Sequence, residues 1–180
     1  DANVNGAAHF LEHLIFKGTA SMQQRDLEVL VVNVAAPLEV YTSREQTVYY
    51  ARSLKKDIPM VTKMLGDILQ NSKVADSAVD RERDVILREM QEIDEIPEEV
   101  VFDYLHSTAF QDCSLGRTIL GPVENINSLK SVDLLSYVKA HYKPHRMVLA
   151  AAGDIQHDEL VNLANKHFGK MPADPTSISS

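Results

Sequence analysis

The sequence lacks a second cysteine, a long apolar run and an excess of basic residues. Because Cys113 stands alone, no internal disulfide can form, and its polar neighbours indicate a surface thiol in a reducing compartment. No stretch approaches the roughly 18 uninterrupted apolar residues of a membrane-spanning helix. The formal net charge of −8 argues against nucleic acid as a partner and favours cationic ligands.

The composition is that of a globular domain. The chain has 180 residues, which is long enough to bury a core. Its content of 44% hydrophobic and 24% charged residues is typical of globular proteins. Hydrophobic periodicity predicts an α+β domain with a mixed, mostly antiparallel sheet covered by helices. We expect strands at residues 38–42 and 47–54 and a buried central strand at residues 147–152. Helices are expected at residues 6–16, 23–34, 58–69, 78–93, 98–110, 131–141 and 157–169.

Two histidines four residues apart, His9 and His13, are the most informative chemical signal in the sequence. On a helix, residues with this spacing lie on one face about 5–6 Å apart, so both imidazoles can bind one zinc ion. Glu12, one residue before the second histidine, lies beside them, where a general base for an attacking water is needed. The order His-x-x-Glu-His is the inverted zinc motif, but solvated histidines on an ordinary helix give the same pattern.

Two glutamates in a later charged segment complete the candidate site. Glu82 and Glu89 are seven residues apart, which is two helical turns, so they share one face of a helix. A catalytic zinc usually has three protein ligands and one open position, and two histidines with a distant carboxylate are a known ligand set. Glu89 can supply that carboxylate. On spacing alone, the alternative is a charged helix face whose glutamates pair with neighbouring arginines.

Longer stretches carry a resemblance to a known family. They comprise residues 5–19, 41–50, 81–91, 99–106, 115–122 and 146–153, and they extend through nearly the whole chain. The sequence resembles the inverzincin metallopeptidases of family M16, in the branch that contains the β subunits of mitochondrial processing peptidases. The core 1 subunits of the cytochrome bc1 complex belong to the same branch, and in several lineages one protein does both jobs. The resemblance implies Zn²⁺ as the cofactor.

The resemblance also assigns roles to the candidate residues. In the family both histidines of the motif bind zinc, and the third ligand is the glutamate 76 positions after the second histidine, which corresponds to Glu89. Glu12 corresponds to the catalytic base, and Glu82 to a glutamate that supports the catalytic site. Core 1 proteins without peptidase activity typically replace the first histidine, whereas His9 is intact. A working zinc site formed with His13 is therefore expected.

Acidic residues after the proposed third ligand indicate a basic substrate. In the family, the acids that match Glu99 and Asp103 bind the arginine two residues before the cleaved bond, as found in Arg-rich presequence peptides. The two are four residues apart and share a helical face, so they can hold one guanidinium together. Phe16 matches the residue that receives the side chain after the cut. The alternatives are a solvated acidic helix end and an ordinary core contact for Phe16.

Two features depart from the family pattern. Glu39 replaces an asparagine that lies beside the substrate backbone, and a carboxylate cannot donate a hydrogen bond to a scissile carbonyl. The zinc motif also begins at position 9, whereas the family has at least two strands before it and a second, similar domain after it. We therefore expect residues 1–171 to form an N-terminally truncated catalytic zinc-peptidase domain, and residues 172–180 to be a linker toward an absent second domain.

The predicted function is that of a zinc metalloendopeptidase domain that removes N-terminal targeting presequences from proteins imported into mitochondria. The resemblance implies a heterodimer with a noncatalytic α subunit, located in the mitochondrial matrix or peripherally on the inner membrane. The alternative is a structural core 1 subunit of the respiratory cytochrome bc1 complex (complex III), either bifunctional or inactive because of Glu39. A bacterial relative with another substrate is a third interpretation.

Overall fold

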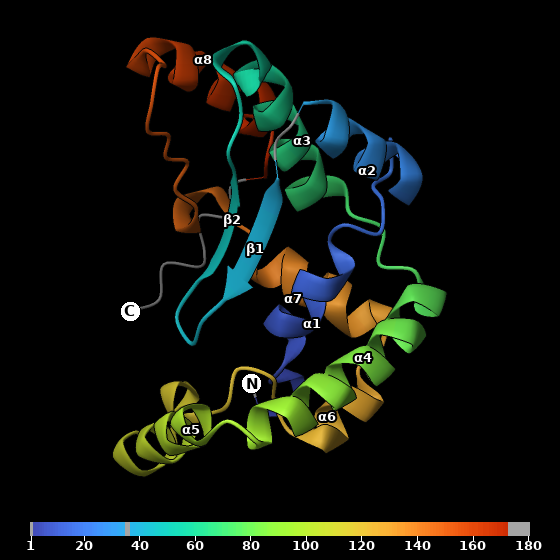
Figure 1. Ribbon diagram of the computed structural model, residues 1–180, viewed down its shortest axis with the longest axis vertical. Helices are drawn as coiled ribbons and strands as arrows, with labels where there is room; N and C mark the ends of the chain where they lie inside the picture. Colours follow the sequence, from blue (N-terminus) through green and yellow to red (C-terminus); the bar gives the residue numbers. More distant parts are fainter. Residues whose placement is uncertain (1, 35–36, 173–180) are drawn as a thin grey trace.

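The computed structural model describes residues 2–34 and 37–172 and consists mainly of helices around one β-hairpin (Figure 1). The helices are Ala7–Leu14 (α1), Gln24–Asn33 (α2), Ile58–Asn71 (α3), Asp76–Asp94 (α4), Pro97–Ala109 (α5), Val123–Ser128 (α6), Ser131–His141 (α7) and His157–Phe168 (α8). The strands are Leu38–Thr42 (β1) and Thr47–Ala51 (β2), which pair antiparallel. The predicted α+β class is confirmed. No described helix is both long and apolar enough to cross a lipid bilayer.

The β1–β2 hairpin has a register that is fixed at its turn and along its strands. The Ser43 amide donates to the Gln46 carbonyl at 2.8 Å and closes the loop between the strands. Glu39 lies directly opposite Tyr50, whose hydroxyl donates to the Glu39 carboxylate. Because β1 also contacts α1, the hairpin lies beside the helix that carries the two histidines of the motif.

Two predictions about the C-terminal part have different outcomes. The strand predicted at residues 147–152 is wrong, because the segment forms no strand and exposes 91% of Val148 and 37% of Leu149. Its apolar residues are favourable for a strand, but a strand also needs a neighbour to complete its hydrogen bonds, and no described strand pairs with it. The predicted linker at residues 172–180 lies outside the described residues, except for Pro172.

Helix α1 lies at the centre of the fold, between two apolar clusters (Figure 1). The first cluster joins α1 to α4, α6 and α7, and its largest buried side chains are Phe10, Leu11, Leu14, Ile86, Ile126 and Leu134. The second joins the end of α1 to α2 and α3 through the buried residues Ile15, Leu27, Val34, Val61, Met64 and Ile68. Full burial of such a side chain contributes roughly 1.5–3 kcal/mol, so α1 is fixed from two sides.

Two glycines allow the start of α1 to lie against a distant loop. Gly6 and Gly121 have φ angles of 98° and 79°. Residues other than glycine rarely adopt a backbone conformation with such positive φ angles. A Cβ on Gly6 would lie 2.3 Å from the Leu120 carbonyl oxygen, and one on Gly121 would lie 2.3 Å from the Asn5 carbonyl oxygen. Both backbones therefore approach more closely than any side chain would allow, which sets the direction in which α1 begins.

Arg83 ties α4 to α6 and to the residue that follows α6. Its guanidinium donates to the carbonyl of Ile126 and, at 2.9 Å, to the carbonyl of Leu129. The same group lies 5.8 Å from the ring centroid of Phe10 on α1. One partly buried cation on α4 therefore contacts two segments that are distant in sequence, residues 126–129 and α1, and it fixes α4 relative to α1.

Replacement of Gly6 by alanine is expected to destabilise the protein through the start of α1. The left-handed backbone conformation alone costs about 1–3 kcal/mol for a residue with a Cβ, and the overlap with the Leu120 carbonyl adds to this cost. The measurement is the free energy of unfolding in urea. Gly153→Ala is the control, because Gly153 has a φ of 137° but no neighbour within 4 Å of the added Cβ. Equal losses in the two variants would contradict a steric constraint at Gly6.

Candidate metal centre

Two helices bring three potential metal ligands together. Helix α1 carries His9 and His13, and α4 carries Glu89. The Nε2 atoms of His9 and His13 lie 3.3 and 3.1 Å from the two carboxylate oxygens of Glu89. One donor atom of each residue lies within 4.8 Å of the other two, and no other set of His, Cys, Asp or Glu in the described ranges meets this condition. The geometry therefore fits the predicted ligand set.

The burial of His9 favours the form that binds a metal. Its side chain is only 7% exposed, and burial lowers the pKa of His9, although the charge of Glu89 opposes this effect. A neutral imidazole offers the lone pair that a metal requires. The Nδ1 atom of His9 is buried and has no hydrogen-bond partner in the described part of the chain. The ring of His9 lies edge-on to that of His13, with 4.9 Å between the ring centroids.

Glu82 lies on the opposite side of His13 from Glu89. Its Oε2 atom is 3.6 Å from Nδ1 of His13, while Nε2 of the same ring is directed at Glu89. A carboxylate near the second nitrogen of a ligating histidine fixes the orientation and tautomer of that ring. The position of Glu82, which is 12% exposed, is therefore that of a supporting residue rather than of a fourth ligand.

Lys17 belongs to the same cluster and was not assigned a role from the sequence. Its Nζ atom lies 2.9 Å from Oε1 of Glu82, so the lysine compensates the charge of a largely buried carboxylate. Helical spacing could not indicate this contact, because Lys17 lies beyond Leu14, the last residue of α1. The cluster accordingly has two layers, with the ligands in front and the Glu82–Lys17 pair behind His13.

Two tyrosines meet near the proposed base, Glu12. Tyr49 of β2 and Tyr142, directly after α7, share a hydrogen bond of 2.6 Å between their hydroxyl groups. Burial raises the pKa of Tyr49 and raises that of Tyr142 to about 12, and the negative charge of Glu12 acts in the same direction on both. Both side chains are therefore neutral at physiological pH. The sequence did not identify this pair, because its members are 93 residues apart and no pattern links them.

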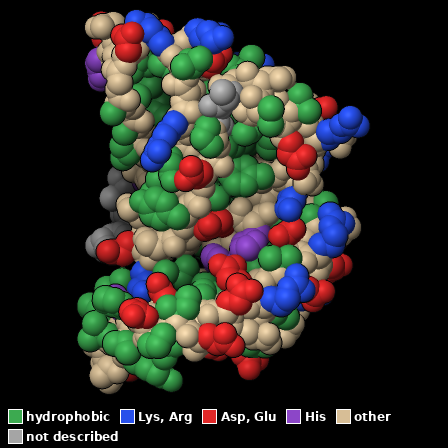
Figure 2. Space-filling model, in the orientation of Figure 1, with side chains coloured by type: hydrophobic (Ala, Val, Ile, Leu, Met, Phe, Trp, Pro, Cys, Tyr) green, Lys and Arg blue, Asp and Glu red, His purple; other side chains and the backbone are tan. Residues whose placement is uncertain are grey.

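The acids proposed to bind substrate lie on α5. Glu99 is exposed, whereas Asp103, one turn later, is partly buried and paired with Arg44 of the hairpin loop. Figure 2 shows acidic side chains around the histidines that reach the surface near the middle of the visible face. The structure thus places Glu99 and Asp103 on one helix as expected, but one of the two carboxylates already holds a guanidinium.

The remaining predicted site residues have partners within the fold. Phe16 is partly buried and packs against the second apolar cluster, a contact that matches the alternative interpretation of this residue. The exposed carboxylate of Glu39 accepts a hydrogen bond from Tyr50, its cross-strand neighbour. This bond raises the pKa of the Tyr50 phenol. Neither arrangement tests a contact with substrate, so both roles remain predictions.

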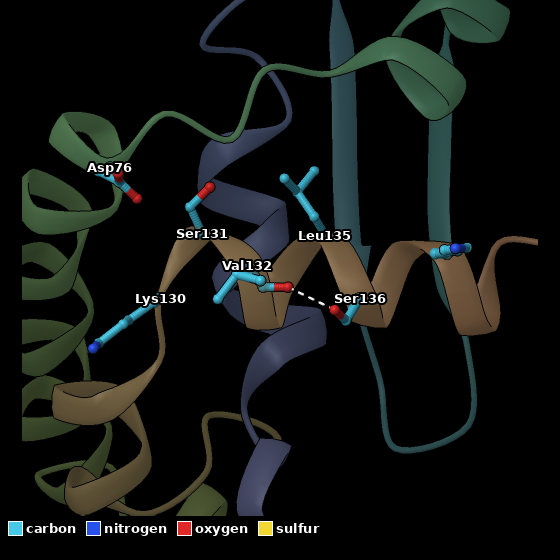
Figure 3. A pocket seen from close by; sticks show the side chains of 7 residues that line it. Asp76, Lys130, Ser131, Val132, Leu135 and Ser136 are labelled. Carbon is cyan, nitrogen blue, oxygen red and sulfur yellow. Dashed lines mark hydrogen bonds between the residues drawn. The ribbon is translucent and has the colours of Figure 1, made fainter.

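A hollow at the start of α7 contains none of these residues. Figure 3 shows its lining, which consists of Asp76, Lys130, Ser131, Val132, Leu135, Ser136 and Lys139. Its two serine hydroxyls are used within the fold, because Ser131 donates to the Val74 carbonyl and Ser136 donates to the Val132 carbonyl at 2.7 Å. The candidate site is therefore the histidine and glutamate cluster.

Comparison with known families agrees with this site. Residues 1–123 match the model of the insulinase family, peptidase family M16, and residues 128–179 match that of the peptidase M16 inactive domain. The first match includes all the residues of the metal cluster, from His9 to Glu89. The family match and the arrangement of donor atoms thus concern the same part of the chain.

Related proteins share more than half of their aligned residues with this chain. It is 58% identical over 165 residues to the human mitochondrial-processing peptidase subunit beta, covering 92% of this chain and 34% of that protein. It is 54% identical over 178 residues to the probable mitochondrial-processing peptidase subunit beta of Schizosaccharomyces pombe, covering 99% of this chain and 39% of the relative. The chain thus spans a little over a third of the length of the relatives it matches.

Solved structures share the fold. A protease from Helicobacter pylori superposes with a TM-score of 0.91 at 20% identity, over all of this chain and 44% of the other. The periplasmic protease PqqL from Escherichia coli superposes with a TM-score of 0.84 at 21% identity, over all of this chain and 21% of the other. With the family match over residues 1–123, the chain belongs to peptidase family M16.

Proposed function

We propose that this chain is the zinc-binding part of a metalloendopeptidase that removes N-terminal targeting presequences from proteins imported into mitochondria. The observation that carries the proposal is the approach of donor atoms from His9, His13 and Glu89 to within 4.8 Å, with Glu12 on the same helix as the histidines. The relatives named mitochondrial-processing peptidase subunit beta support the substrate class and a mitochondrial location, which we narrow to the matrix.

The chemistry divides between the metal and Glu12. Zinc held by His9, His13 and Glu89 supplies a Lewis acid that polarises a carbonyl and makes water a better nucleophile. The Glu12 carboxylate removes a proton from the attacking water and delivers it to the nitrogen of the leaving amine. Because Glu12 shares α1 with two of the ligands, the base stays at a fixed position relative to them.

The surrounding residues position these groups. Glu82 orients His13 through Nδ1, and Lys17 holds Glu82 in place. The Tyr49–Tyr142 hydrogen bond joins β2 to the end of α7 near Glu12.

The negative charge of the chain indicates the substrate class, and the names of its relatives indicate the partner. A net charge of −8 and the exposed Glu99 on α5 suit basic presequence peptides. We infer that the chain works in a heterodimer with a noncatalytic α subunit, because the relatives are themselves named as beta subunits.

Substitution of Glu12 by glutamine is expected to leave zinc bound and to abolish hydrolysis, because it removes the base and no ligand. His9→Ala and Glu89→Gln are expected to lose zinc, since each removes one of three ligands. The measurements are zinc content by metal analysis and cleavage of a presequence peptide by the full-length protein with its partner. Glu92→Gln, an exposed glutamate on the same helix, is the control for Glu89→Gln. A zinc-free Glu12→Gln beside a fully loaded Glu89→Gln would contradict these roles.

Lys17→Met is expected to weaken zinc binding about tenfold, the smaller effect typical of residues that support a ligand. The substitution leaves Glu82 without its cation and so loosens the carboxylate that orients His13. Zinc affinity is measured by competition with a chelator. Lys73→Met removes an exposed lysine and is the matched control. Unchanged affinity in Lys17→Met would exclude a contribution of the Glu82–Lys17 pair.

Glu99→Gln is expected to raise KM about tenfold for a presequence peptide with arginine two residues before the cut, because one charge-assisted hydrogen bond to the guanidinium is lost. A peptide with alanine at that position should be cleaved as before, and added salt should weaken cleavage of the arginine peptide. Glu98→Gln, at the neighbouring position on α5, is the control. The same change with both peptides would identify Glu99 as part of a solvated helix end.

A further inference from the structure

An ion pair connects the hairpin loop to α5. Arg44 lies in the loop between β1 and β2, and its Nη2 atom donates to Oδ1 of Asp103, 59 residues later. The Arg44 side chain is 13% exposed and that of Asp103 is 35% exposed. The pair is therefore partly shielded from water, where attraction between opposite charges is stronger than on an open surface. Asp103 is one of the two acids proposed to bind substrate, and its carboxylate is already paired with Arg44.

The pair leaves Arg44 incompletely bonded. Its Nη2 atom contacts one carboxylate oxygen, whereas the strongest arginine–carboxylate pairs use two parallel hydrogen bonds. The Nε atom of Arg44 is buried and has no hydrogen-bond partner in the described ranges. An unpaired buried donor costs free energy, so this guanidinium is held less firmly than a fully bonded one. Its place on Asp103 is therefore open to competition.

A second guanidinium at the same place would meet more negative charge. Glu99 is exposed and lies one turn before Asp103 on α5, so both carboxylates are on one face. A guanidinium has five N–H donors and can contact two carboxylates together. The described contacts of Arg44 with acids include Asp103 but not Glu99. A substrate arginine that lies between the two acids can therefore form more charge-assisted bonds than Arg44 forms.

We propose that Arg44 is a specificity-determining residue, an internal guanidinium that occupies Asp103 and that a substrate arginine must displace. The proposal rests on the proposed function, which supplies the basic substrate. While Arg44 holds Asp103, a peptide without arginine gains no ion pair with that carboxylate. A peptide with arginine releases Arg44 and binds between Glu99 and Asp103. Arg44 thereby weakens the binding of substrates that place an arginine at this position and leaves the binding of other substrates unchanged.

The test measures binding without turnover. We use the full-length protein with its noncatalytic partner in a Glu12→Gln background, and we titrate it with two presequence peptides that differ by arginine or alanine two residues before the cut. Arg44→Gln is expected to lower Kd for the arginine peptide about tenfold, because the substrate no longer competes for Asp103. Kd for the alanine peptide should not change. Arg44→Lys should stay near the parent, since lysine can still occupy the carboxylate.

Two further variants separate competition from general charge effects. Adding Asp103→Asn to Arg44→Gln should abolish the gain for the arginine peptide. Arg52→Gln removes the same charge from an exposed arginine directly after β2 and should change neither Kd. Weaker binding of both peptides by Arg44→Gln, with a lower Tm, would make the pair a structural tie and overturn the proposal. Weaker binding of the arginine peptide alone would make Arg44 an aid to that substrate and would also overturn it.

Cleavage by the protein with intact Glu12 distinguishes this proposal from the proposed function. If it cuts neither peptide, yet Arg44→Gln gains arginine-dependent affinity, the proposed function fails and the role of Arg44 stands. If it cuts the arginine peptide and Arg44→Gln leaves the ratio of the two Kd values unchanged, only the role of Arg44 fails. Absence of binding of either peptide to every variant overturns both.

Discussion

The packing of α1 against α4 is the constraint on which the metal centre depends. His9 and His13 belong to one helix and Glu89 to the other, so no local turn brings the three together. The distance between them is set by the first apolar cluster and by Arg83, which lies over Phe10 and holds the segment after α6. A ligand set built on two packed helices is rigid, because any relative movement of the helices would disturb many contacts at once.

The β1–β2 hairpin links three other parts of the fold, and it contacts each of them through different residues. Through Tyr49 it reaches the end of α7, through Arg44 it reaches α5, and β1 itself contacts α1. The helix that carries Glu99 contacts α4, but its exposed apolar side chains leave it few buried contacts of its own. The Arg44–Asp103 pair therefore joins the hairpin to a helix that has no fully buried residue of its own.

Local patterns predicted much of this arrangement, and long-range contacts account for what they missed. The spacing of His9 and His13 requires only a helix, and β1 was predicted with its observed bounds. Alternating apolar residues predicted β2 from its observed start, but the strand ends at Ala51 and not at residue 54. The apolar run at residues 147–152 looked like a strand, but sequence periodicity does not show whether a neighbouring strand is present. Arg44 and Asp103 are 59 residues apart, and no local sequence pattern indicates that their side chains are in contact.

The pairing of Lys17 with Glu82 has a consequence for which ions the cluster accepts. Their formal charges cancel, so with neutral imidazoles the remaining negative charges are those of Glu12 and Glu89. A divalent cation would make this cluster electroneutral, whereas a monovalent or trivalent ion would leave an excess charge among largely buried groups, where it is costly. Charge balance therefore favours a divalent ion at this cluster, in addition to the preference set by the donor atoms.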